Sequence, residues 1–109
     1  MTELIDFMIE DIENLLVRVE NKIYDPLFDK DDMTEMAIIL IKMHEELLYL
    51  KQDQDVLNNP ILVRLKQGTL KKMIKDLQTI DQRDKDSIFT TLINGLKQMV
   101  DLFKPSNSK

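Results

Sequence analysis

Apolar residues recur at alternating spacings of three and four along most of the chain, which is the pattern of amphipathic α-helices. Four such segments are separated by short polar stretches. Their apolar stripes are Ile5, Met8, Ile12, Leu15 and Val19; Met33, Met36, Leu40, Met43, Leu47 and Leu50; Ile61, Leu62, Leu65, Leu70, Met73, Ile74, Leu77 and Ile80; and Phe89, Leu92, Leu96, Met99 and Phe103. The pattern predicts an all-α protein with helices over about residues 3–23, 32–55, 60–79 and 85–103.

Residues that favour helix ends stand between these segments. Pro26 ends the first predicted helix, because the residue before a proline avoids helical dihedral angles. Asp32 and Glu35 form a capping box for the second helix, and Asn59-Pro60 is typical of a helix start. Because the connectors are only about 4–9 residues long, neighbouring helices are expected to run antiparallel, as an up-down-up-down four-helix bundle.

The length of the chain suits one domain with a core of its own. We place this helical-bundle domain at residues 1–104, and expect residues 105–109 to form a disordered tail. Gly68 lies inside the third predicted helix, where a bend or the close approach of another helix is expected.

The composition indicates the cellular compartment in which the chain is expected. The chain contains no cysteine, which excludes disulfides and thiolate metal sites and favours a reducing compartment. Its first residues are acidic, unlike the basic start of a signal peptide. No apolar run approaches the roughly 20 residues that span a bilayer. We therefore expect a cytoplasmic protein with no membrane span.

Charge is distributed unevenly along the chain. Residues 1–59 carry 15 acids and 5 bases, a net charge of −10, whereas residues 60–109 carry 5 acids and 10 bases, a net charge of +5. Two interpretations follow. The acidic and basic segments could face each other inside one bundle, or they could form separate surfaces for different partners.

The inventory of catalytic and metal-binding side chains is small. The single histidine, His44, is followed four residues later by Leu48, where a zinc-protease helix needs a second histidine. The serines and threonines have no hydrolase nucleophile motif. The two glycines, Gly68 and Gly95, are too isolated to form a phosphate loop. The sequence predicts no enzyme activity, no cofactor and no metal site.

Three features are candidates for partner binding. The third predicted helix carries five bases before its first acid: Arg64, Lys66, Lys71, Lys72 and Lys75. Of these, Arg64, Lys71 and Lys75 are predicted to share a stripe opposite the core. The second predicted helix has apolar surface beyond its stripe, at Ile38 and Ile39. Gly95 leaves a shallow spot on the fourth, where a partner helix could approach.

One stretch resembles a known family. Between Met36 and Leu65, an apolar helix ends in Glu46-Leu47-Leu48-Tyr49-Leu50-Lys51-Gln52, and a polar linker leads to Pro60-Ile61-Leu62-Val63-Arg64-Leu65. This layout resembles the immunity proteins of pediocin-like (class IIa) bacteriocins. The resemblance implies a cytosolic four-helix bundle that protects its host by recognising, from the cytosolic side, a sugar-transporter permease engaged by a bacteriocin.

The expected function is that of a non-catalytic protein-binding module, a regulator or adaptor, with phages and mobile elements among its expected sources. Bacteriocin immunity and nucleic-acid binding through the basic helix at residues 60–79 are the alternatives. Nucleic acid is less favoured, because that helix has no aromatic residue for base stacking and the chain has a net charge of −5. The partner of such a module is another protein or a second copy of the chain in a homodimer.

Overall fold

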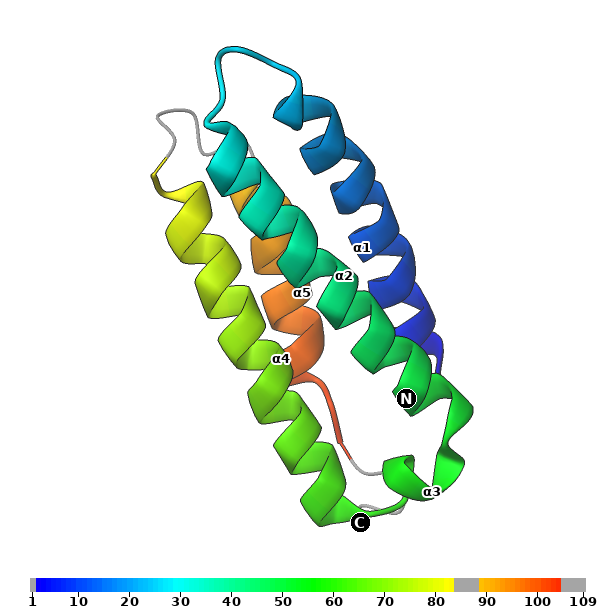
Figure 1. The fold of residues 1–109 in the computed structure, drawn as a ribbon. Helices are drawn as coiled ribbons and strands as arrows, with labels where there is room; N and C mark the ends of the chain where they lie inside the picture. Colours follow the sequence, from blue (N-terminus) through cyan, green and yellow to red (C-terminus); the bar gives the residue numbers. More distant parts are fainter. Residues whose placement is uncertain (1, 84–88, 105–109) are drawn as a thin grey trace.

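The structure is a computed structural model that describes residues 2–83 and 89–104, and this part of the chain is helical (Figure 1). The helices are α1 (Thr2–Ile23), α2 (Lys30–Gln52), α3 (Gln54–Leu57), α4 (Pro60–Asp81) and α5 (Thr90–Asp101). The predicted all-α class is confirmed. The predicted tail at residues 105–109 and the predicted helical residues 85–88 lie outside the described residues.

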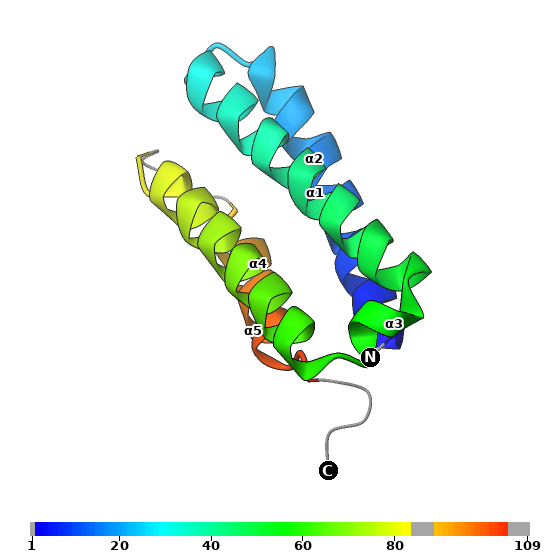
Figure 2. The ribbon, with the colours of Figure 1, turned by 60° about the horizontal axis from the view of Figure 1, so that its bottom comes forward.

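The long helices surround one apolar core. α1 packs against α2 and α5, and α4 also packs against α2 and α5. Figure 2 shows the pair of α1 and α2 beside the pair of α4 and α5. Every residue of the stripes predicted for the first two helices is at most 1% exposed, so these two predictions are confirmed. No helix in the described part of the chain is both long and apolar enough to cross a membrane.

The start of α2 differs from the prediction. The helix begins at Lys30, and Asp29 is its N-cap, because Asp29 Oδ1 accepts a hydrogen bond from the backbone N–H of Asp32 at 2.9 Å. Asp32 is not the cap, since its carboxylate lies 3.1 Å from Arg83 Nη1. Arg83 Nη1 also lies 3.8 Å from Glu35 Oε2. The two acids of the predicted capping box therefore bind the segment that follows α4.

α2 also ends before the predicted end at about residue 55. Asp53 is its C-cap, and Asp53 Oδ1 accepts hydrogen bonds from the backbone N–H groups of Asp55 and Val56, at 3.1 and 3.4 Å. This turn starts α3 and buries Val56 and Leu57, which are 6% and 1% exposed. A continued helix would instead place Val56 about five whole turns beyond Ile38, on the same outward face. The break therefore gains core contacts that a straight helix would lose.

α4 begins as predicted. Asn59 Oδ1 accepts hydrogen bonds from the backbone N–H groups of Ile61 and Leu62 at 3.0 and 3.2 Å, and Pro60 is the first helical residue. The helix continues through Gly68 for 22 residues in all. Nothing lies within 4 Å of the position that a Cβ would take at Gly68. The predicted close approach of another helix at this glycine is therefore wrong.

Replacing Gly68 with alanine is expected to raise the free energy of unfolding by about 0.5–1 kcal/mol, because glycine inside a helix costs that much in backbone entropy. The new methyl group meets open space, so no clash offsets the gain. Urea unfolding followed by circular dichroism measures the change. Gly95→Ala should give a similar gain, since its Cβ would also meet nothing within 4 Å. A lower stability of Gly68→Ala would contradict this account.

The last described helix begins beside a buried acid. Asp81, at the end of α4, is 2% exposed. Its Oδ1 accepts a hydrogen bond from the backbone N–H of Phe89 at 3.3 Å, and its Oδ2 accepts one from the Thr90 hydroxyl at 2.7 Å. A side chain eight or nine residues earlier in the sequence thus satisfies donors at the start of α5. α5 ends at Asp101, close to the predicted end.

Candidate protein-binding surface

Two of the predicted partner-binding lysines contact acids of this chain. Lys66 Nζ lies 2.6 Å from Glu46 Oε2, and this ion pair joins α4 to α2. Lys71 Nζ lies 3.2 Å from Asp101 Oδ1, and this second pair joins α4 to α5. The Glu46–Lys66 pair connects the acidic first half of the chain to the basic second half. This contact fits the first interpretation of the uneven charge, in which acidic and basic segments face each other inside one bundle.

The other predicted bases, Arg64, Lys72 and Lys75, are exposed, and none forms an ion pair with another described residue. Lys75 follows Lys71 by one helical turn, so both lie on one flank of α4. That flank borders α5, because Lys71 reaches Asp101. Lys71 and Lys75 of the predicted stripe therefore lie beside α5 instead of opposite the core.

The predicted apolar contacts are spread over two helices. Ile38 is 48% exposed on the outer side of α2, whereas Ile39 is half-buried and packs against the core. Gly95 is half-buried on α5, with open space where a Cβ would stand. No Cα atom of α2 lies within 8 Å of a Cα atom of α5 among the described residues, so the structure does not bring Ile38 and Gly95 together.

Sequence reasoning missed an apolar surface at the start of α4. Ile61 and Leu65, predicted to be in the core, are 71% and 62% exposed. The two residues are one helical turn apart, so they form one outward patch. The residues that α4 buries toward the core share a regular spacing and include Val63, Leu70, Ile74 and Leu77. The sequence did contain a signal for this exposure, since Ile61 and Leu65 fall outside the regular spacing of the buried residues of α4.

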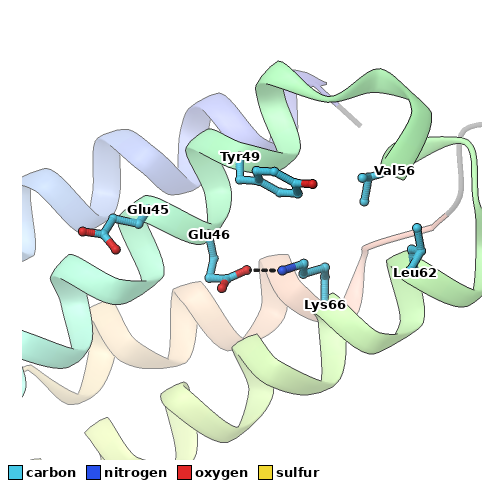
Figure 3. A pocket seen from close by; sticks show the side chains of 6 residues that line it. All are labelled: Glu45, Glu46, Tyr49, Val56, Leu62 and Lys66. Carbon is cyan, nitrogen blue, oxygen red and sulfur yellow. Dashed lines mark hydrogen bonds and ion pairs between the residues drawn. The ribbon is translucent and has the colours of Figure 1, made fainter.

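A pocket of about 350 Å³ lies beside this patch, between the end of α2, the short α3 and the start of α4 (Figure 3). Its lining consists of Glu45, Glu46 and Tyr49 from α2, Val56 from α3, and Leu62 and Lys66 from α4. Tyr49 and Val56 stand across from Lys66 and Leu62 in Figure 3. Three helices therefore contribute to one concave surface at this end of the molecule.

Contacts within the chain fix the polar wall of this pocket. Glu46 and Lys66 are each about one-third exposed and form their ion pair across the pocket. Lys66 Nζ also lies 5.3 Å from the centroid of the Tyr49 ring, within the range of a cation–π contact. Val56 and Leu62 add apolar side chains to the lining. Such a lining suits an apolar side chain that carries or adjoins a polar group.

The single histidine has a structural contact. His44 Nε2 lies 2.9 Å from Glu13 Oε1, so this pair links α2 to α1. Among residues 2–83 and 89–104, no group of three or more histidine or acidic side chains could hold a metal ion. The geometry at this histidine supports a role in helix packing.

No family model, curated protein or solved structure matches this chain. The resemblance of residues 36–65 to bacteriocin immunity proteins therefore stays a prediction.

Proposed function

We propose that this chain is a non-catalytic protein-binding module that binds an amphipathic helix of another protein at the start of α4. The binding surface consists of Tyr49 and Leu62, which line the pocket of Figure 3, and of Ile61 and Leu65, which are exposed on α4 next to Leu62 and Lys66; we call it the α2–α4 apolar surface. The partner helix covers Ile61 and Leu65 and inserts one large apolar side chain into the pocket.

The exposure of these four side chains carries the proposal. Tyr49, Ile61 and Leu65 are 50%, 71% and 62% exposed, and Leu62 is 38% exposed. Single exposed apolar residues are common on proteins, but a gathered apolar patch is typical of a binding site. Removing such area from water contributes about 25 cal/mol per Å². A partner that covers this surface therefore gains hydrophobic free energy that the isolated chain does not recover.

The shape of the surface favours a helix as the occupant. Ile61 and Leu65 are one turn apart, so a helix lying along α4 meets them with residues of the same spacing. A pocket of about 350 Å³ has room for a leucine, methionine or phenylalanine side chain. Arg64 and Glu45 are exposed at the margins, and they give the surface a polar rim, as protein interfaces usually have.

We further propose that the four long helices form an antiparallel up-down-up-down bundle. The described chain extends 49 Å along one axis and 20 and 18 Å along the other two. Two helices of about 10 Å diameter fit across each short axis. The colour gradient of Figure 1 supports the alternating direction, since the colours of α1, α2, α4 and α5 run in alternate directions along the long axis. This arrangement leaves the outer face of α4 free for a partner.

Site-specific photo-crosslinking in the cells that encode the protein tests the proposed function. The photoreactive amino acid p-benzoylphenylalanine in place of Leu65 should give a covalent adduct with one protein, which mass spectrometry identifies. The same replacement at Val17 is the matched control, because Val17 is 58% exposed on α1. It should not give that adduct, since no Cα atom of α1 lies within 8 Å of a Cα atom of α4 among the described residues.

The identified partner then allows a quantitative test with purified proteins. Leu65→Ser should weaken binding by about tenfold or more, because truncating an interface anchor typically costs above 1 kcal/mol. Val17→Ser should leave the Kd unchanged. Two results would contradict the proposal: the same adducts from both positions, or a Kd that Leu65→Ser leaves unaltered.

A further inference from the structure

A groove of about 360 Å³ runs between α4 and α5. Its lining consists of Lys71, Ile74, Lys75, Gln78, Lys97 and Asp101. None of these residues lines the pocket of Figure 3, which borders α2 on another flank of α4. The groove is therefore a separate surface, and it has three bases and one acid.

The two ends of this groove have complementary side chains. At one end, Gln78 Nε2 of α4 donates a hydrogen bond to Asn94 Oδ1 of α5 at 3.1 Å. At the other end, Lys71 Nζ of α4 lies 3.2 Å from Asp101 Oδ1 of α5. Each contact pairs a donor from α4 with an acceptor from α5. The register of the two helices is thus set at both ends of the groove.

The middle of the groove is different, because both helices contribute a lysine there. Lys75 lies between the two α4 residues that make the end contacts, and Lys97 lies between the two α5 residues. Both lysines are exposed, and neither forms an ion pair with another described residue. The acid of the lining, Asp101, already pairs with Lys71. Two like charges in one groove repel, and an anionic group between them would remove the repulsion.

We propose that this groove binds an acidic segment of a protein, with one aspartate or glutamate carboxylate held between Lys75 and Lys97. Ile74, which is 1% exposed, closes the floor of the groove, and the aliphatic stems of the lining lysines give apolar surface against which such a segment can pack. Gln78 and Asn94 each have a second polar atom that does not take part in their mutual hydrogen bond, and these atoms can bind the peptide backbone. The proposal does not depend on the α2–α4 apolar surface.

A nucleic acid fits this groove less well. The lining contains no aromatic side chain on which a base could stack. The net charge of −5 on the chain opposes the approach of a continuous row of phosphates. Asp101 in the groove and Asp76 beside Lys75 add local repulsion. An acidic peptide can present one carboxylate at a time, and its remaining groups can be neutral.

Fluorescence anisotropy with the full chain tests this inference. The probe is a fluorescein-labelled peptide of alternating glutamate and glycine, measured at low and at physiological ionic strength. We expect binding that weakens as salt rises, because the contact is electrostatic. The double variant Lys75→Glu/Lys97→Glu should bind the peptide about tenfold more weakly or worse. Leu65→Ser should bind it as the unaltered chain does, which separates this inference from the proposed function.

The matched control is Lys30→Glu/Lys42→Glu, which makes the same change in net charge at two exposed positions of α2. It should keep most of the binding, and circular dichroism should show that both double variants are folded. Equal losses in the two variants would overturn the proposal, since net charge alone would then explain them. Tighter binding of duplex DNA than of the peptide would also overturn it. So would displacement of the peptide by an equal concentration of inorganic phosphate.

Discussion

Replacing Phe89 with alanine is expected to lower the free energy of unfolding by about 3–5 kcal/mol. Phe89 is 2% exposed and belongs to the core cluster, so its truncation removes apolar contacts and leaves a cavity. α5 has only 12 residues, and Phe89 anchors its first turn. Domains of this size are stable by about 5–15 kcal/mol, so the variant should lose a large share of its stability.

Urea unfolding followed by far-ultraviolet circular dichroism measures this loss. Phe7→Ala is the matched control, because Phe7 is 61% exposed on α1. The same chemical change there should alter the free energy of unfolding by no more than about 0.5 kcal/mol. Equal effects at the two positions would mean that Phe89 is not part of the core.

The second large effect is expected at Asp81. Asp81→Ala should destabilise the fold by about 2–3 kcal/mol, because it removes the buried acceptor of the hydrogen bonds from Phe89 and Thr90. One of these bonds is to the backbone N–H of Phe89, which cannot reach water easily at this buried position. The other is to the Thr90 hydroxyl. Loss of both releases the start of α5 from the end of α4. Thermal and urea unfolding both report the change.

Two further variants make the Asp81 result specific. Asp76→Ala removes an exposed acid from the same helix and should change stability by about 0.5 kcal/mol or less. Asp81→Asn keeps the size of the side chain and one acceptor oxygen, so its loss should be intermediate. If alanine at both positions gave the same stability, the hydrogen bonds of Asp81 would not matter to the fold.

The sequence predicted α1 and α2 well because their apolar stripes are unbroken. Each stripe residue from Ile5 to Val19 and from Met33 to Leu50 falls on the buried side. The helix caps were harder to predict, because several acids stand near the start of α2. Asp29 caps the helix and Asp32 does not, since Arg83 binds Asp32 from a distant part of the chain. Local sequence rules contain no information about that partner.

The candidate site was less predictable for a similar reason. Ile61 and Leu65 are residue types that are common in cores, but they lie on an exposed side of α4, and which side of a helix is buried depends on how the other helices pack against it. In the α4–α5 groove, sequence reasoning found Lys71 and Lys75 but not Lys97. Lys97 joins them only through the register of α5 against α4, which contacts between the helices determine.

The methionines of the core have a consequence for oxidative damage. Met8 on α1 and Met33, Met36 and Met43 on α2 have no exposed surface and belong to the apolar core. Peroxides oxidise a thioether only where they can reach the sulfur, and the sulfoxide product is polar. In this chain without cysteine, the reactive sulfur atoms of the core are therefore protected for as long as the helices stay packed. Opening of the fold and oxidation of its core are coupled, and a chain oxidised while open would repack poorly.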